Sequence, residues 1–244
     1  MKDRVAVVTG ASSGIGYATA LAPAGAGVRV AAGARRADRL AELEKEIGEK
    51  DSIMVQEMDV TSRADCDLLV GSAVKRWGAV DILVNNAGVM PLSLAENVKV
   101  DEWDRMVDVN IKGVLYCTAA AIPHMIAKKS GHIVNVSSVA GRTVFRGGSV
   151  YCATKHAITA FSEGLRRELG PAHNIRVTCI EPGAVATELL YSITDESMDD
   201  FVQGSKNMYR LKPEDVANAI LFAVKSPPHM TVNEILLRPT EQER

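Results

Sequence analysis

Tyr151 and Lys155 stand four residues apart in a segment with helical spacing, and a helix places side chains at this separation on one face. A free tyrosine has a pKa of about 10, and a neighbouring ammonium group favours its phenolate form. Such a pair is able to exchange a proton with a bound molecule near neutral pH. The same spacing also arises by chance, as an exposed aromatic ring and a solvated lysine, so the acid/base interpretation depends on further residues.

Two polar residues elsewhere in the chain favour that interpretation. Ser138 follows the apolar run 132–136, and open α/β sheets bind ligands at the ends of such strands. Its hydroxyl is therefore suited to bind a carbonyl oxygen beside the phenol. Asn110 lies inside a predicted helix over residues 100–125. Asparagine competes there with backbone hydrogen bonds, so we expect it to have a polar task.

A glycine-rich turn connects the first apolar run, 5–9, to a segment of helix-compatible residues. Glycines let a backbone turn tightly against a pyrophosphate, and the N-terminus of the following helix offers free N–H groups and a partial positive charge. A glycine pattern alone is weak, but its place after the first strand of an α/β chain makes it more specific. The sequence predicts a dinucleotide phosphate site at Gly10, Ser12, Ser13, Gly14, Ile15 and Gly16.

The residues after the second apolar run indicate which dinucleotide fits. Folds that bind NAD place an acidic residue there, roughly 20 positions beyond the glycine turn, to hold the ribose 2′-hydroxyl. Here Ala34 is followed by Arg35 and Arg36, whose guanidinium groups are suited to a 2′-phosphate. The alternative is two solvated charges at a helix start, where the helix dipole disfavours them. We expect NADP(H) rather than NAD(H).

Two other strand ends carry residues of interest. Asp59 follows the run 53–58 and is a candidate partner for an adenine amino group. After the run 80–84, Asn86, Ala87 and Gly88 would let the backbone pass close to the adenosine ribose. For each, an ordinary turn at a strand end is the alternative interpretation.

Short apolar runs and helical segments alternate along the whole chain. The runs fit strands buried on both faces, and helix starts are indicated by Ser62 with Asp65 and by Pro213 before two acidic residues. This order predicts a single domain over residues 1–244, an α/β, Rossmann-type, doubly wound parallel sheet of about seven strands with helices on both faces. The expected strands are 5–9, 28–32, 53–58, 80–84, 132–136, 175–180 and 234–237.

Composition narrows the classes of partner. The 244 residues carry 28 basic and 30 acidic side chains, a net charge of −2, so no global field attracts nucleic acid or anionic lipid. The chain has no membrane-length apolar run and opens without a signal-like segment, so we expect a cytoplasmic protein with a small-molecule partner. The four cysteines and five histidines are dispersed, which predicts unpaired, mostly buried thiols and no catalytic metal.

With these landmarks in order, the chain resembles the short-chain dehydrogenase/reductase family, roughly 250-residue type, across essentially its whole length. The resemblance is carried by the segment 9–16, Asp59, the segment 86–88, Asn110, Ser138, the segment 151–155, Pro182 and Gly183 with Thr187.

The resemblance implies a catalytic tetrad and further cofactor contacts. Tyr151 would donate or remove the proton, Ser138 would orient the carbonyl, and Lys155 would lower the tyrosine pKa and hold the nicotinamide ribose. Asn110 would support a water chain. Pro182, Gly183 and Thr187 would hold the nicotinamide, and Val60 beside Asp59, Tyr151 and Lys155 complete the expected cofactor set. The family also usually assembles as homotetramers or homodimers, which agrees with the weakly polar helix 100–125 and the helix expected from Ser149.

Two features depart from the commonest family pattern. Pro23 falls inside the helix after the glycine turn, so we expect that helix to be kinked or short. The C-terminal segment 233–240 lacks the ending typical of 3-oxoacyl carrier-protein reductases, and together with the segment 180–183 it is similar to the branch of NADP-dependent hydroxy-amino-acid and clavaldehyde dehydrogenases. A carrier-protein substrate is therefore less expected.

The sequence predicts an NADPH-dependent oxidoreductase, a carbonyl reductase or alcohol dehydrogenase, that transfers hydride between nicotinamide and a carbonyl or secondary alcohol. A 3-oxoacyl thioester reductase and a non-catalytic NADP(H)-binding sensor are the alternatives. Residues 188–210 combine apolar and acidic side chains, as expected of an amphipathic substrate lid over a small to medium, partly apolar substrate. A segment serving mainly at a subunit contact is the alternative for this lid.

Overall fold

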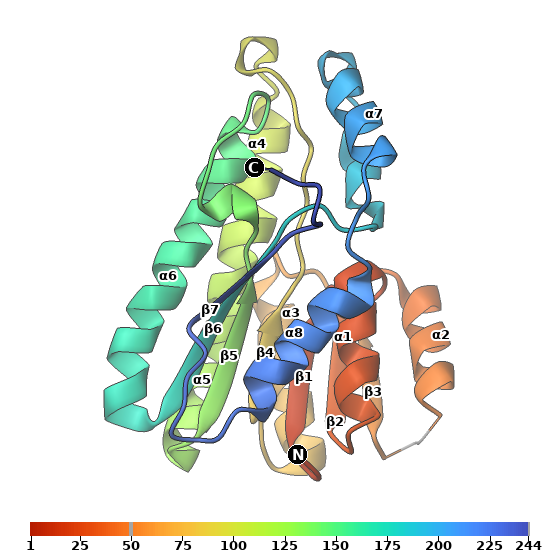
Figure 1. Ribbon diagram of the computed structural model, residues 1–244. Helices are drawn as coiled ribbons and strands as arrows, with labels where there is room; N and C mark the ends of the chain where they lie inside the picture. The colour runs from red at the N-terminus through yellow and green to blue at the C-terminus, as the bar shows by residue number, and fades with distance from the viewer. Residues whose placement is uncertain (49–50, 244) are drawn as a thin grey trace.

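The computed structural model describes residues 1–48 and 51–243. Seven parallel strands form one sheet in the order β3-β2-β1-β4-β5-β6-β7 (Figure 1). The strands are β1 Val5–Thr9, β2 Arg29–Ala34, β3 Ile53–Glu57, β4 Ile82–Asn85, β5 Gly131–Val136, β6 Ile175–Pro182 and β7 Glu234–Leu237. The predicted doubly wound sheet is confirmed.

Helices cover both faces of this sheet. On one face α1, α2 and α8 lie over an apolar cluster built on β1, β2 and β4, and on the other α3, α5 and α6 enclose a second cluster with Leu83 and Ile133. Both faces of the central strands are therefore buried from solvent, which explains their continuous apolar runs. The helices are α1 Gly14–Ala24, α2 Ala37–Ile47, α3 Arg63–Trp77, α4 Val100–Val107, α5 Gly113–Lys128, α6 Ser149–His173, α7 Asp199–Asn207 and α8 Pro213–Lys225.

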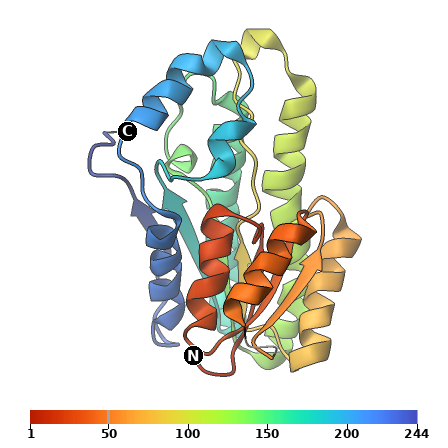
Figure 2. The same cartoon turned by 90° about the vertical axis from the view of Figure 1, so that its right-hand side faces the viewer.

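The strand order reverses between β1 and β4, since β2 and β3 lie to one side of β1 and the later strands to the other. In open parallel sheets this reversal separates the loops at the carboxyl ends of neighbouring strands and leaves a crevice for a ligand. Figures 1 and 2 show α4 and α7 projecting beyond that end of the sheet. The fold therefore places these two helices above the crevice.

The expected helix starts are confirmed. The Ser62 hydroxyl accepts a hydrogen bond from the backbone N–H of Asp65 at 3.3 Å. At the start of α8, the Asp215 carboxylate accepts from the backbone N–H of Lys212 at 2.8 Å. Pro23 lies in the last turn of α1, which ends one residue later, so the helix is short as expected.

The long helix expected over 100–125 contains an irregularity. A π-helical turn, Asp108–Lys112, separates α4 from α5. Asn110 lies in this turn, and such turns often occur at functional positions. No helix among the described residues is both long and apolar enough to cross a membrane.

Candidate active site

One pocket of about 870 Å³ runs across the carboxyl ends of β1 to β6. The predicted site residues that line it are Gly10, Ser12, Ser13, Gly14, Ile15, Arg35, Arg36, Asp59, Val60, Asn86, Ala87, Gly88, Ser138, Tyr151, Lys155, Pro182, Gly183 and Thr187. Gly16 and Asn110 do not line this pocket. The fold therefore brings together, at one site, residues from six separate strand ends.

The glycine turn leaves room for a ligand where a side chain would fill the space. Gly10 and Gly14 have positive φ angles of 66° and 54°, a conformation that favours glycine. A Cβ atom on Gly10 would lie 2.8 Å from the Cα of Ala87, and one on Gly16 would clash with the Gly10 carbonyl oxygen. The absence of a side chain at Gly16 thus lets α1 pack closely against the backbone of the turn at Gly10. Ser13 precedes α1 without capping it by its side chain, which leaves helix N–H groups for an anion.

Arg36 bridges the glycine turn to the segment after β6. Its guanidinium donates to the Ser13 hydroxyl at 2.7 Å and to the Ser12 hydroxyl at 3.2 Å. It also donates to the Glu188 carboxylate at 2.8 Å, and this bond holds the pKa of Glu188 below its ordinary value. Arg35 lines the same end of the pocket. The two guanidinium groups and the glycine turn suit a phosphorylated ribose beside a pyrophosphate.

Tyr151 and Lys155 lie in the first turns of α6, whose N-terminus begins beside the pocket. The two side chains are 5% and 7% exposed, and the Lys155 Nζ atom lies 5.7 Å from the centre of the Tyr151 ring. Lys155 donates to the Val136 carbonyl oxygen at 3.0 Å. Ser138 donates to the Pro182 carbonyl oxygen at 3.3 Å and accepts from the Ala140 N–H.

Burial sets the protonation of this pair. It raises the pKa of Tyr151 to about 12, against the opposing effect of a hydrogen bond with Ser138. It lowers the pKa of Lys155 to about 8. The sequence predicts that the ammonium group and the positive ring of an oxidised nicotinamide together favour the phenolate, and in the protein without cofactor desolvation of the phenol dominates. The phenol is therefore protonated at pH 7.

Asn110 connects three segments without reaching the pocket. Its amide accepts from the Val89 N–H at 2.9 Å, donates to the Val89 carbonyl oxygen at 3.0 Å and donates to the Thr154 hydroxyl at 3.2 Å. The residue is 1% exposed. It therefore fixes the loop after β4 against α6, next to Lys155, which explains its placement inside a helix.

The predicted lid folds into two short 3-10 turns, Glu188–Ser192 and Glu196–Met198, followed by α7. From this segment Leu189, Leu190, Ser192, Phe201 and Ser205 line the pocket. Phe201 stacks on Phe145, with ring centroids 5.4 Å apart and planes 6° apart. Together with Glu188, which also lines the pocket, the segment thus contributes both apolar and polar side chains to its wall.

Glu188 and Gln242 are among the pocket residues to which sequence reasoning assigned no contact. Glu188 was included only as part of the lid, although it pairs with Arg36 across 152 residues. Gln242 lines the pocket, and its side-chain oxygen accepts from the Ala184 N–H at 2.8 Å. Neither residue belongs to a local motif, so no spacing pattern was available to find them.

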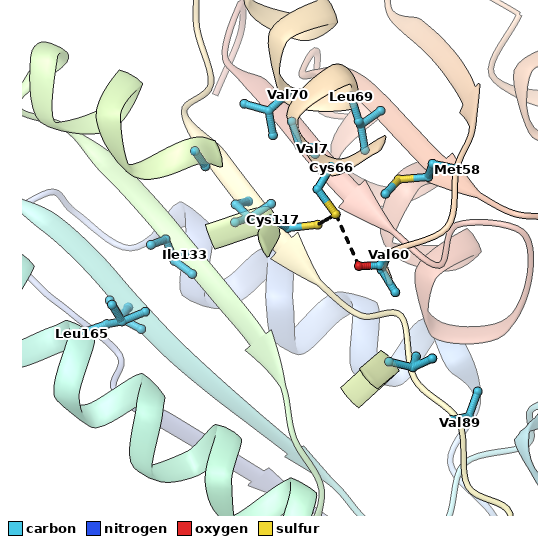
Figure 3. Packing of buried hydrophobic residues seen from close by; sticks show 14 of the residues in the cluster. Val7, Met58, Val60, Cys66, Leu69, Val70, Val89, Cys117, Ile133 and Leu165 are labelled. Carbon is cyan, nitrogen blue, oxygen red and sulfur yellow. Dashed lines mark hydrogen bonds between the residues drawn. The ribbon is translucent and has the colours of Figure 1, made fainter. Parts of the chain in front are cut away.

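The four thiols are buried and unpaired, as expected. The fold nevertheless brings two of them together, because Cys66 on α3 and Cys117 on α5 have Sγ atoms 3.2 Å apart within the apolar cluster (Figure 3). Burial and this contact raise the pKa of the Cys117 thiol. Among residues 1–48 and 51–243, no group of three metal-ligating side chains occurs.

The chain is similar to known proteins along almost its whole length. A family model described as short chain dehydrogenase matches residues 4–197. An uncharacterized oxidoreductase of Staphylococcus saprophyticus is 46% identical over 244 residues, which are 99% of this chain and 98% of the relative. A glycine betaine reductase of Emericella nidulans is 44% identical over 244 residues, 99% of this chain but 19% of that longer protein.

Solved structures agree with this similarity. The closed form of a serine dehydrogenase complexed with NADP+ superposes with a TM-score of 0.91 at 36% identity, covering 98% of this chain and 96% of the other. An alcohol dehydrogenase of the archaeon Thermococcus sibiricus, complexed with 5-hydroxy-NADP, has a TM-score of 0.86 at 29% identity, with coverages of 99% and 98%.

Proposed function

Since the chain belongs to the short-chain dehydrogenase family, we propose that it is an NADPH-dependent oxidoreductase acting on a carbonyl or secondary alcohol. The observation that carries this proposal is the pocket itself. A glycine turn and two arginines lie at one end, and the buried Tyr151 and Lys155 lie toward the other with the partly buried Ser138. The family model and the relatives confirm the family expected from the sequence motifs, and the residue roles below are part of the proposal.

The proposed cofactor site uses the glycine turn for the pyrophosphate and Arg35 and Arg36 for the 2′-phosphate. Asp59, Val60 and the segment 86–88 line the pocket. We assign Asp59 and Val60 to the adenine and the segment 86–88 to the adenosine ribose. Pro182, Gly183 and Thr187 line the same pocket, and we assign them to the nicotinamide. NADP(H) supplies the hydride donor or acceptor when it is bound. The two structural relatives, solved in complex with NADP+ and with 5-hydroxy-NADP, support this assignment.

Proton transfer is assigned to Tyr151. Its buried phenol is protonated at neutral pH, so it donates a proton to the carbonyl oxygen during reduction and accepts one during oxidation. Ser138 binds the same oxygen and orients it. Lys155 holds the nicotinamide ribose and favours the phenolate as the charge develops. Asn110 holds the loop after β4 beside Lys155. In the proposal it also supports a chain of water molecules that leads to bulk solvent.

The substrate end supports a small to medium, partly apolar substrate. Residues 188–210 supply much of its apolar lining and act as the proposed lid. The serine and alcohol dehydrogenases among the structural relatives support a hydroxyl or carbonyl group as the reacting centre. Reduction of a 3-oxoacyl thioester is the alternative chemistry, and a sensor that binds NADP(H) without turnover is the alternative from another class.

Assembly and location complete the proposal. A cytoplasmic homotetramer, or a homodimer, would bury the outer faces of α5 and α6. Leu115 on α5 is 38% exposed in the isolated chain, as an interface residue would be. Light scattering at micromolar concentration tests the assembly, and a monomeric mass would contradict it.

The decisive experiment is a paired titration of the protein with NADPH and NADH, followed by turnover assays. Ketones, aldehydes, 3-oxo esters and acyl thioesters form the substrate panel, and the reduced-cofactor absorbance is the readout. Preference for NADPH with turnover of a ketone or aldehyde supports the proposal. Turnover of thioesters alone favours the alternative enzyme, and tight binding without any turnover favours the sensor.

A further inference from the structure

We propose that Glu181 is a positioning residue, whose carboxylate holds together the three segments that carry Ser138, Lys155 and Pro182. The inference rests on the proposed function, because the chemistry it serves is hydride and proton transfer in the pocket. Glu181 does not line that pocket, and neither do Arg142 and Thr159, its main partners. It therefore acts through other residues.

The first segment is the 3-10 turn that follows Ser138, Val139–Gly141. Arg142 ends this turn and donates from its Nε atom to both oxygens of the Glu181 carboxylate, at 2.9 and 2.8 Å. The Glu181 side chain is 0% exposed, whereas that of Arg142 is 39% exposed. Arg142 also pairs with Glu234 on β7, and the two carboxylates raise its pKa above the ordinary value. The ion pairs of the positively charged Arg142 with Glu181 and Glu234 thus connect the turn to β6 and β7.

The second segment is α6, one turn beyond Lys155. The Thr159 hydroxyl lies 3.2 Å from the Glu181 carboxylate and also 3.2 Å from the Lys155 carbonyl oxygen. Ser137, directly before Ser138, donates to that same carbonyl oxygen at 2.9 Å and lies 3.1 Å from the Thr159 hydroxyl. The backbone of the lysine and the serine segment therefore meet beside the same carboxylate.

The third segment is the end of β6. Glu181 directly precedes Pro182, whose carbonyl oxygen accepts the Ser138 hydroxyl. The Ile180 carbonyl oxygen accepts the Ser137 N–H at 2.8 Å. A change in the backbone at Glu181 would thus displace both Ser138, which is proposed to orient the carbonyl, and the residues proposed to hold the nicotinamide.

A charged carboxylate at a fully buried position is costly unless it is paired, and an apolar side chain of similar size is often at least as stable there. Hydrogen bonds from a planar guanidinium, however, fix direction as well as distance. The arrangement is better suited to setting the relative position of three segments than to stabilising the fold. Glu181→Gln keeps the shape of the side chain and removes the charge, so it tests this role directly.

For Glu181→Gln we expect kcat to fall by about 10- to 100-fold, while the Kd for NADPH and the substrate KM change by less than about threefold. The pH profile of kcat for alcohol oxidation should move to higher pH, because the Ser138 bond that lowers the Tyr151 pKa is displaced. Glu163→Gln is the matched control. It removes the charge of a carboxylate on α6 that pairs with Arg166 and Arg167, each at 2.6 Å, away from the pocket, and should leave kcat and its pH profile unchanged.

Hydrogen–deuterium exchange with NADPH bound supplies a readout that needs no turnover. In Glu181→Gln the segments 137–142, 151–159 and 182–184 should lose protection together, and in Glu163→Gln they should not. A wild-type protein without turnover would contradict the proposed function and leave this exchange result to decide the positioning role. If Glu181→Gln fails to fold, Arg142→Met and Arg142→Lys replace it, with kcat expected to be lower in the methionine variant. A variant of either residue that folds and keeps the wild-type kcat, pH profile and exchange pattern would overturn the proposal.

Discussion

The ammonium nitrogen of Lys155 lies 5.7 Å from the centre of the Tyr151 ring, and both side chains are more than nine-tenths buried. Burial acts against the charged form of each group, so the tyrosine pKa rises to about 12 and the lysine pKa falls to about 8. At pH 7 the site therefore holds a neutral phenol beside an ammonium group. This protonation state suits donation of a proton to a carbonyl oxygen.

Tyr151→Phe should abolish turnover. Loss of a general acid typically costs on the order of 10²- to 10⁴-fold in rate, and the ring that packs in the site is retained. NADPH affinity, measured by fluorescence titration, should change by less than about threefold. Tyr17→Phe removes a hydroxyl that donates to the Glu46 carboxylate outside the pocket and should keep wild-type kcat. Retained turnover in Tyr151→Phe would refute the assignment of the acid.

Lys155→Met should give a more stable but inactive protein. At pH 7 the folded protein holds a desolvated ammonium group, and its removal should raise the unfolding free energy by roughly 1–3 kcal/mol, net of the lost bond to Val136. Between about pH 8 and 10.5 the unfolded wild type binds more protons at this lysine than the folded state does. Wild-type stability therefore gains from this group as pH rises, and the advantage of the variant shrinks.

Urea unfolding of both proteins at several pH values from 7 to 9.5 checks this prediction. The range stops below pH 10. Above that pH the folded state keeps the Tyr151 proton that the unfolded state loses, because the Tyr151 pKa is raised, and the free energy of unfolding then falls as pH rises. A variant less stable than the wild type at pH 7, or a difference independent of pH, would contradict the assigned burial cost.

The sequence predicted all seven strands, because the central strands are buried on both faces and are continuous apolar runs that end where the crevice begins. The bounds of β1 and β7 match the prediction, and the other five strands differ from it by one or two residues at one or both ends. β2 continues to Ala34 and β6 to Pro182, since each keeps a pairing partner in the neighbouring strand. The π-helical turn at Asn110 was not predictable, because it accompanies bonds to Val89, 21 residues away.

Site residues within local motifs were likewise predictable, whereas long-range charge pairs were not. The glycine turn predicts a phosphate-binding loop, and the Tyr151–Lys155 spacing predicts two side chains on one helix face, each from a few consecutive residues. Glu188 meets Arg36, and Glu181 meets Arg142, only after the sheet has assembled. The sequence indicates a charge near Tyr151 but not the degree of burial, which raises the Tyr151 pKa in the protein without cofactor. The expected lowering of that pKa by Lys155 and an oxidised nicotinamide ring together stays a prediction.

Arg35→Ala and Arg36→Ala should each weaken NADPH binding by roughly 10- to 100-fold, the effect of losing charge-assisted hydrogen bonds to a phosphate. NADH has no 2′-phosphate, so its Kd should change by less than about threefold. Arg39→Ala is the matched control, because Arg39 pairs with Glu42 at 2.9 Å on α2 and does not line the pocket. Equal losses for both cofactors would contradict the 2′-phosphate assignment.

Glu188→Gln should strengthen NADPH binding. The carboxylate accepts from Arg36 at 2.8 Å, and its lowered pKa keeps it charged at neutral pH, so it competes with a phosphate for the same guanidinium. An exposed pair of this kind contributes up to about 1 kcal/mol, which predicts an increase in NADPH affinity of up to about fivefold.

Titrations of NADPH and NADH at low and moderate salt measure this effect for Glu188→Gln and for Glu42→Gln, which changes the Arg39 pair instead. The gain should be larger for NADPH than for NADH and should diminish with salt, because screening weakens the competing ion pair. Weaker NADPH binding in Glu188→Gln would show that Glu188 orients Arg36 toward the phosphate rather than competing with it.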